Sequence, residues 1–251
     1  GITTFIGGNC GFSPCTVHTH CDHNELLENT LFEVPDGNAV LCDDIATFDQ
    51  KVASSDIRHN FFEMVGHGSY RTSLSGFDSR KLTADERETL LTSLENALKK
   101  GALGVSLGLQ YKPGVFVSRD EIVDVAKLVA RYDRVMAVHA KAYSCMSGTY
   151  PPIPFGRAHN LKAIDELLSV AEETGVRLQF SHLIFAGRNT WKTVDEALAL
   201  FDKARAKGVD VCFDMFPYDC GATLLNTMLP DWFMDGMPQS ANSKWARLRL
   251  R

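Results

Sequence analysis

The feature that most constrains this chain is a regular alternation of helix signals and short apolar segments. Three helix starts carry a capping box, in which a Ser or Thr caps the first turn and a Glu three residues later reaches back: Thr83, Ser118 and Thr193. Each precedes an amphipathic run, and a fourth such run has no box. The predicted helices cover 88–101, 122–133, 161–175 and 197–208.

Directly after each predicted helix comes an apolar segment that is too short for a helix and too uniformly apolar for a half-exposed strand. We interpret these segments as buried parallel strands, and two earlier segments raise their number. The predicted strands are 3–8, 61–67, 102–109, 135–140, 176–183 and 209–216. The alternation predicts a parallel α/β fold, either an open doubly wound sheet or a (β/α)₈ barrel. Six strands are two fewer than a closed barrel contains.

Composition excludes several classes of protein. The 251 residues are 45% hydrophobic and 23% charged, which is enough for one domain of barrel size. A formal net charge of -5 argues against a nucleic-acid partner. No apolar run is long enough to span a bilayer, so we expect a cytoplasmic protein without a membrane partner. Because the chain opens on Gly1 and runs straight into a strand, we also expect its natural N-terminus to lie upstream.

Groups able to bind a metal or move protons stand at five predicted strand ends: Cys10, His67, His139, His182 and Asp214. In parallel α/β folds, functional groups collect at the C-terminal ends of the strands. A lone histidine there is more often a hydrogen-bonding residue than a ligand, but two on successive strands, together with a thiolate, form a donor set that Zn²⁺ favours. The sequence therefore predicts a metal site made by Cys10, His139 and His182.

A denser cluster in "HTHCDH" competes for the same role. It contains His18, His20, Cys21 and His23. Its spacing matches neither C-x₂-C nor H-x₃-H, and it lies in a loop beyond the first predicted strand. We interpret it as a polar surface loop, with adventitious metal capture as the alternative.

Several blocks resemble the N-acyl-D-amino-acid deacylases, a branch of the amidohydrolase superfamily. The most specific is "GITTFIGGNCGFSP", and others follow in the family's order: "VGHGSYR", "ALKKGALGVSLGLQYKPGVFVS", "VHAKAYS", "GVRLQFSHLIFAGRNTW" and "GVDVCFDMFPYDCGAT". The resemblance implies a (β/α)₈ TIM-like metal-dependent hydrolase barrel that is incomplete. Strands two to seven would lie within 1–251, with a loop insertion at about 15–45 and a lid region starting after about 226.

The resemblance also implies site residues and a cofactor. Cys10, His139 and His182 correspond to ligands of a catalytic Zn²⁺ in one tight site, and the sequence is compatible both with this one zinc and with a second, weaker site. Tyr111 of the "LQYKPG" block corresponds to a tyrosine that helps to hold the substrate carbonyl. Substrate contacts are further expected from His67 and from Thr223, which stands beside Ala222 where relatives often have a serine.

The implied reaction is hydrolysis of the linear amide of an N-acyl-D-amino acid to a carboxylate and a D-amino acid. The family's strand-one His-x-His pair and strand-eight catalytic Asp fall outside 1–251, so we expect this segment alone to be inactive and prone to aggregate. Asp214, on strand seven, is expected to be structural. One alternative is a cyclic-amide hydrolase of the hydantoinase or dihydroorotase type, although strand four has no lysine to bridge two metals. The other is a non-catalytic metal-binding module.

Overall fold

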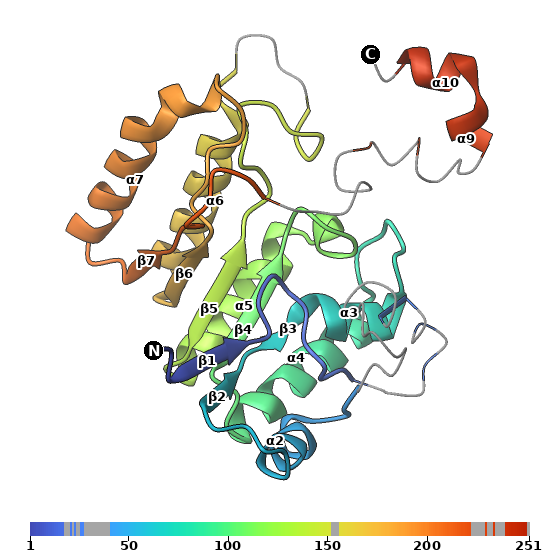
Figure 1. Cartoon of the computed structure of the whole chain (residues 1–251), viewed down its shortest axis with the longest axis vertical. Helices are drawn as coiled ribbons and strands as arrows, with labels where there is room; N and C mark the ends of the chain where they lie inside the picture. The colour runs from blue at the N-terminus through green and yellow to red at the C-terminus, as the bar shows by residue number, and fades with distance from the viewer. Residues whose placement is uncertain are drawn as a thin grey trace.

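In the part of the chain that the structure describes, seven parallel strands and the helices that cover them form the body of the molecule (Figure 1). The structure is a computed structural model, and it describes residues 1–17, 21, 23, 26–27, 41–151, 156–221, 229, 233 and 239–249. One sheet has five strands in the order β3-β4-β5-β6-β7, and a second pairs β1 with β2. Their bounds are β1 Thr4–Gly7, β2 Asn60–Glu63, β3 Val65–Gly66, β4 Gly104–Gly108, β5 Val135–His139, β6 Arg177–Ser181 and β7 Val211–Phe213. The predicted parallel α/β fold is confirmed.

The second predicted strand, 61–67, is divided in the structure. Its first part is β2, which pairs with β1, and its second part is β3, which pairs with β4. Met64 lies between them, and its backbone N–H donates to the Gly7 carbonyl at 3.1 Å. The segment therefore changes partner at Met64 and links the two sheets. His67 is not a strand residue, because helix α3 (His67–Ser75) begins there.

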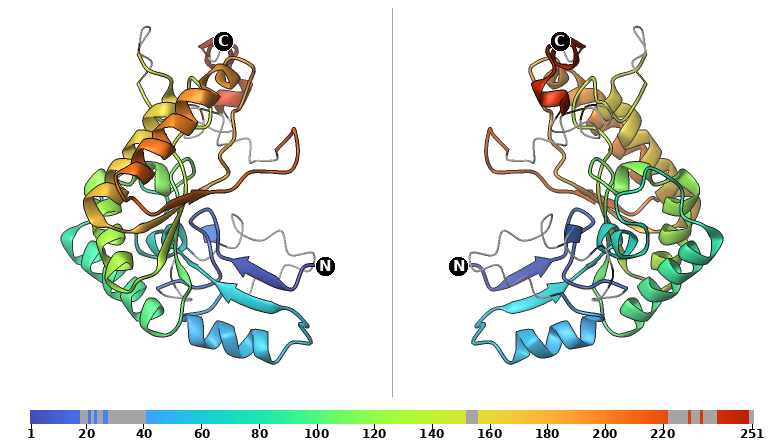
Figure 2. Two further views of the ribbon diagram at one scale, coloured as in Figure 1. Left: turned by 90° about the vertical axis from the view of Figure 1, so that its left-hand side faces the viewer. Right: turned by 90° about the vertical axis from the view of Figure 1, so that its right-hand side faces the viewer.

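Four long helices follow their strands in chain order and pack side by side along one face of the five-stranded sheet (Figures 1 and 2). They are α4 Ala84–Lys99, α5 Arg119–Arg131, α6 His159–Thr174 and α7 Val194–Ala206. Side chains such as Leu94, Val129 and Val138 fill the layer between helices and sheet with no exposed surface. Burial of this apolar layer is the main stabilising contribution. The remaining elements are α2 Ile45–Ala53, α9 Gln239–Asn242, α10 Lys244–Arg249 and the 3₁₀ turns η1 Gly114–Phe116 and η2 Thr190–Thr193.

The three predicted capping boxes differ in the structure. Thr83 forms the complete box with Glu86. Ser118 caps α5, but the carboxylate of Glu121 turns into the core instead of reaching back. The box predicted at Thr193 is wrong, because a 3₁₀ turn precedes α7 and the Thr193 hydroxyl donates to the Thr190 carbonyl.

The predicted loop insertion and lid lie largely outside the described residues. Among the described residues, α2 follows the range of the predicted insertion, and α9 and α10 fall within the range of the predicted lid. No helix within the described ranges is long and apolar enough to cross a membrane.

Candidate metal centre

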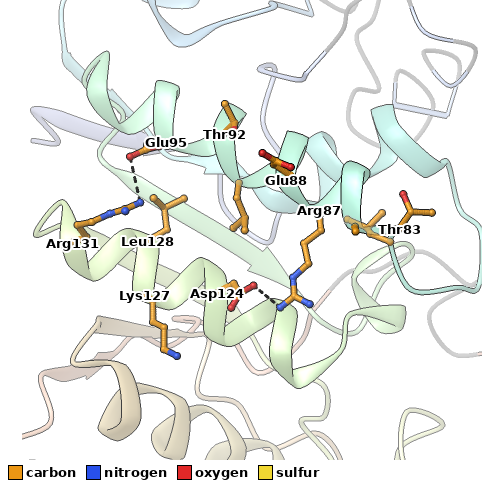
Figure 3. Close-up of a pocket in the computed structure, with 12 residues that line it drawn as sticks. Thr83, Arg87, Glu88, Thr92, Glu95, Asp124, Lys127, Leu128 and Arg131 are labelled. Atoms are coloured by element: carbon orange, nitrogen blue, oxygen red, sulfur yellow. Dashed lines mark ion pairs between the residues drawn. The ribbon is translucent and has the colours of Figure 1, made fainter.

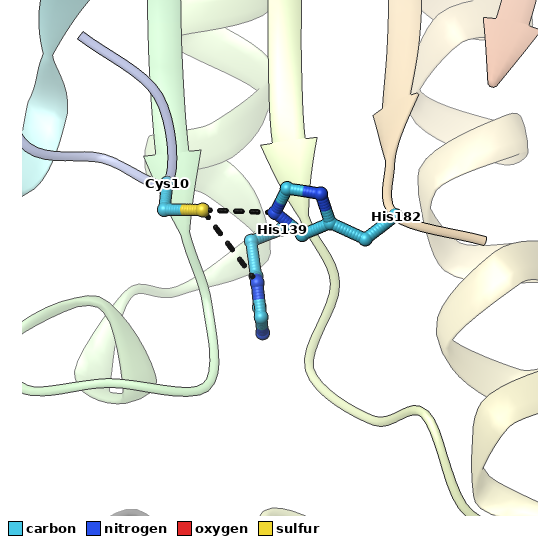
Figure 4. A group of neighbouring side chains, drawn as sticks. All are labelled: Cys10, His139 and His182. Atoms are coloured by element: carbon cyan, nitrogen blue, oxygen red, sulfur yellow. Dashed lines mark hydrogen bonds between the residues drawn. The ribbon is translucent and has the colours of Figure 1, made fainter. Parts of the chain in front are cut away.

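Three predicted site residues meet at the C-terminal ends of the strands. Cys10 follows β1, His139 is the last residue of β5, and His182 comes directly after β6. Their potential ligand atoms all lie within 4.8 Å of one another, and they are the one such group among the described residues. Figure 4 shows the three side chains pointing toward one another beside the ends of β4, β5 and β6. Residues separated by 129 and 172 positions are thus brought into one cluster.

The distances in the cluster suit a zinc ion. Cys10 Sγ lies 3.0 Å from His182 Nε2 and 3.8 Å from His139 Nδ1. Zn–S bonds of about 2.3 Å and Zn–N bonds of about 2.0 Å in a tetrahedron place sulfur and nitrogen about 3.5 Å apart. The two observed distances lie on either side of this value. The donor set and its spacing therefore fit Zn²⁺ with little rearrangement.

The protonation of the two imidazoles favours metal binding. Burial, assisted by the nearby His182, lowers the pKa of His139 to about 3. Burial also lowers the pKa of His182, although the charge of Asp214 opposes this. Both rings are therefore neutral near pH 7 and offer a lone pair to a cation. Burial raises the pKa of the Cys10 thiol to about 11, against the hydrogen bond with Tyr111, so the thiolate needs a cation beside it.

Neighbouring polar groups fix the orientation of the His139 ring. Its Nε2 lies 3.0 Å from Gln110 Oε1, which can only accept, so this nitrogen carries the proton. Its Nδ1 then carries the single acceptor lone pair of the ring. This nitrogen lies 2.6 Å from the Tyr111 hydroxyl, which donates to it, and 3.8 Å from Cys10 Sγ. Tyr143 ties the same region together, because its hydroxyl accepts from the Ala140 N–H and donates to the Ser181 carbonyl. Such outer contacts set the tautomer of a metal-binding histidine.

Two of the three cluster residues have left-handed backbones. The φ angle is 56° at Cys10 and 53° at His182. This conformation costs a non-glycine residue about 1–2 kcal/mol and persists where the surroundings impose it. At His182 the imposing group is Asp214, whose Oδ1 accepts the His182 backbone N–H at 2.6 Å. Asp214 thus has a structural contact with the cluster.

The other predicted site residues have different placements. Tyr111 lies in the cluster's surroundings, as its contact with His139 shows. His67 is 1% exposed and lies 2.9 Å from Glu121 Oε1, so this placement gives no support to a substrate contact. Thr223 lies outside the described residues, as do His18 and His20. Two members of "HTHCDH" are described, Cys21 and His23, and neither belongs to the metal-type cluster.

Sequence reasoning missed Gln110 and Tyr143, which contact the cluster, and Ser106, whose hydroxyl bonds the backbone of Gly8 and Gly11 beside Cys10. Gln110 and Tyr143 are neighbours of singled-out residues in "LQY" and "HAKAY", which was the available signal. Ser106 had no such signal, because a serine in a buried strand is unremarkable in a sequence.

A charged groove lies elsewhere, between α4 and α5 and with β4 behind them (Figure 3). Ion pairs join Arg87 to Asp124 and Arg131 to Glu95 across it. None of its lining residues belongs to the metal-type cluster. Both signs of charge alternate along it, so it lacks the single-sign field that attracts a charged ligand.

The chain matches no family model. Among curated proteins it is 29% identical over 226 residues to an N-acyl-D-glutamate deacylase, and 30% identical over 232 residues to an N-acyl-D-aspartate deacylase, both from Alcaligenes xylosoxydans xylosoxydans. Each match covers 90% of this chain. The chain spans 42% of the length of these curated relatives.

The solved structures that this chain resembles also include deacylases of this type. The N-acyl-D-glutamate deacylase of Bordetella bronchiseptica, in complex with zinc and a phosphonate inhibitor, matches with a TM-score of 0.69 and 27% identity, over 87% of this chain and 42% of its own. A D-aminoacylase described as defining a novel subset of amidohydrolases matches with a TM-score of 0.71 and 26% identity, over 88% and 43%. The fold is thus that of an amidohydrolase domain. The chain is homologous to the N-acyl-D-amino-acid deacylases, which confirms the resemblance of its motifs.

Proposed function

We propose that this chain is the zinc-binding part of a hydrolase that cleaves N-acyl-D-amino acids to a carboxylate and a free D-amino acid. The observation that carries the proposal is the convergence of one thiol and two imidazoles at the strand ends of a chain homologous to deacylases. The zinc and the phosphonate in the Bordetella bronchiseptica enzyme support it, because that inhibitor mimics the tetrahedral intermediate of the reaction.

Cys10, His139 and His182 would hold one tight zinc ion, and we propose a second, weaker metal site beside it. A solved D-aminoacylase has a binuclear centre, described by one-metal activation and second-metal attenuation, which supports this number. When bound, the tight ion supplies a Lewis acid that polarises the scissile carbonyl and lowers the pKa of a water molecule. The chain's own residues then orient the substrate and manage the protons.

Tyr111 is the proposed hydrogen-bond donor to the substrate carbonyl. Its hydroxyl lies 2.6 Å from His139 Nδ1, and once the lone pair of this nitrogen is taken by the proposed zinc ion, the hydroxyl is free to donate to the substrate. Burial raises the pKa of its phenol well above the usual value, and the nearby Cys10 raises it further, so the hydroxyl keeps its proton. A protonated donor aimed at developing negative charge is the arrangement that stabilises an oxyanion. Thr223 remains a proposed substrate contact.

The general base is proposed to lie outside residues 1–251. Asp214 is the one carboxylate in contact with the cluster among the described residues, and its Oδ1 already accepts the His182 N–H. Positioned acid–base groups are typically worth ~10²–10⁴ in rate. We therefore propose that residues 1–251 alone turn over slowly or not at all.

The open edges of the sheets support an incomplete barrel. Ile2, Phe5 and Ile6 in and before β1 are 69%, 42% and 51% exposed, and Met215 after β7 is 62% exposed. Exposed apolar strands of this kind are an aggregation hazard unless another element covers them. We propose that the strands described here correspond to strands two to seven of a (β/α)₈ barrel, and that the remaining strands and a lid after about residue 226 complete it.

A linear amide is the better-supported substrate. A cyclic-amide hydrolase with a lysine-bridged metal pair would need that lysine in β4, and Gly104–Gly108 contains none. A non-catalytic metal-binding module would bind zinc equally well, so metal content does not distinguish it from a hydrolase. A measurement of turnover distinguishes the two.

The deciding experiment measures the release of D-amino acids from N-acetyl-D-glutamate, N-acetyl-D-aspartate and a neutral N-acetyl-D-amino acid. The samples are the full-length gene product, its Cys10→Ala variant and residues 1–251 alone, each with elemental analysis for zinc. We expect turnover and zinc in the full-length protein, loss of both in Cys10→Ala, and zinc without robust turnover in the segment. Full-length protein that binds zinc and hydrolyses none of these substrates would overturn the proposal.

A further inference from the structure

The turn that carries Cys10 has an unusual backbone. Gly8, Cys10 and Gly11 have φ angles of 73°, 56° and 82°, so three residues among four are left-handed. Glycine adopts this conformation freely, but cysteine does not. The surroundings must therefore impose the conformation that sets the direction of the thiol.

One side chain joins both sides of this turn. Ser106 Oγ accepts the Gly11 backbone N–H at 3.0 Å and donates to the Gly8 carbonyl. Ser106 lies in the middle of β4 and has no exposed surface. A hydroxyl that both accepts and donates is required for this bridge, and serine supplies it with the smallest side chain. Removal of the hydroxyl would leave the buried Gly11 N–H without this partner, which would destabilise the turn.

The turn is also fitted closely against β4. A Cβ atom at Gly108 would lie 2.0 Å from the Cys10 carbonyl oxygen, and one at Gly11 would lie 2.5 Å from the Gly108 nitrogen. The backbone of the turn is therefore in direct contact with the backbone of β4. From α3, the Ser69 N–H donates to the Gly11 carbonyl at 3.1 Å. The position of the turn is thus defined by β4 and α3, and its two ends are joined through Ser106.

We propose that Ser106 is a positioning residue for the metal site: its hydroxyl holds the Cys10 turn so that Sγ faces His139 and His182. This inference rests on the proposed function, because it assumes that Cys10 is a zinc ligand. Metal sites depend on the groups behind the ligands, since a ligand displaced by a fraction of an ångström loses much of its bond energy. Ser106 acts through Cys10 and touches neither metal nor substrate.

The test compares zinc affinity in the full-length gene product, measured by competition with a chelator. A second readout is the thiolate-to-metal absorption band of the cobalt-substituted protein, which reports on the Cys10 bond directly. Ser106→Ala should bind zinc about 10–100-fold more weakly and show a weaker band. Ser106→Thr keeps the hydroxyl and should restore both. Ser75→Ala is the matched control, because it removes a hydroxyl that is also buried but donates within α3.

The outcomes separate this inference from the proposed function. If Cys10→Ala keeps wild-type zinc affinity, the metal site itself is wrong. If Cys10→Ala loses zinc while Ser106→Ala matches the wild type in affinity and band, the positioning role alone is overturned. Should Ser106→Ala fail to fold even when refolded with zinc, Ser106 is a core residue and the proposal is again overturned.

Discussion

Two polar clusters in this molecule contain histidines near strand ends, and these histidines differ in their partners. His139 and His182 face a thiol, and His139 also contacts a phenol and an amide. His67, by contrast, lies against the Glu121 carboxylate, which also accepts from Arg71 Nε at 3.2 Å. His67 and His139 are buried, and His182 is half-buried. The first cluster combines neutral imidazoles with a thiol and could receive a cation, whereas the second is an internal network that already contains a cation, the Arg71 guanidinium.

This difference shows why position at a strand end is not sufficient for a functional role. Burial opposes ionisation of Glu121, but the hydrogen bonds and charges of His67 and Arg71 outweigh it and lower the pKa of Glu121. Arg71 in turn donates to the Arg80 carbonyl, which anchors the loop after α3. Loss of one partner from the buried His67–Glu121–Arg71 network should therefore destabilise the fold, whereas Cys10, His139 and His182 are the proposed metal ligands.

The largest expected effect is a loss of stability caused by a change in the His67–Glu121–Arg71 network, with no effect on zinc binding. Glu121→Gln leaves the Arg71 guanidinium buried without its carboxylate, and breaking a buried pair typically costs about 3–5 kcal/mol. The free energy of unfolding, measured with denaturant, should fall by this amount while zinc affinity stays unchanged. Glu173→Gln is the matched control, because its pair with Arg119 is about half exposed and should contribute little.

The same variant has a pH signature. Because the folded-state pKa of Glu121 is lowered, its contribution is fully present above the unfolded value of about 4.5 and is lost as pH falls through the folded value. The difference in stability between wild type and Glu121→Gln should therefore shrink below about pH 4.5. A stability difference that is independent of pH would contradict a role for the charge of Glu121. A loss of zinc affinity would contradict the independence of the network and the cluster.

The next prediction concerns kcat of the full-length enzyme and a residue of the cluster's surroundings. Tyr111→Phe removes the proposed donor to the substrate carbonyl, and loss of one such donor typically lowers kcat by ~10²–10³. Zinc content should not change. Tyr132→Phe removes a hydroxyl that bonds Glu95, away from the cluster, and should leave kcat unaltered. A Tyr111→Phe enzyme with wild-type kcat would show that the phenol only packs against His139.

A smaller effect concerns the left-handed backbone of His182. Asp214→Ala removes the acceptor of the His182 N–H and should weaken zinc binding about 10–100-fold, as loss of an outer contact to a metal ligand does. Asp214→Asn retains an acceptor oxygen and should bind nearly as well as the wild type. Equal weakening in both variants would indicate that the charge of Asp214, and not its hydrogen bond, acts on the cluster.

The sequence predicted the parallel fold and the meeting of Cys10, His139 and His182, because periodicity locates strands and parallel strands end at one edge. It did not predict the partners of each group. His67 and His139 stand at similar predicted strand ends, and only the three-dimensional fold shows that Glu121, on the helix after β4, reaches the first and Gln110 the second. Likewise, the box at Thr193 has the right letters, but a 3₁₀ turn there directs its hydroxyl elsewhere.

The smallest expected effect concerns the N-cap of α5, the helix that positions Glu121. Ser118 Oγ accepts the Glu121 backbone N–H at 3.3 Å and caps the first turn of α5. Ser118→Ala should cost about 1 kcal/mol of stability, typical for loss of an N-cap, without a change in zinc affinity. Thr193→Ala is the informative companion, because Thr193 makes no side-chain cap bond to α7. If Ser118→Ala were as destabilising as Glu121→Gln, the network would depend on the position of the first turn of α5 as much as on the carboxylate itself.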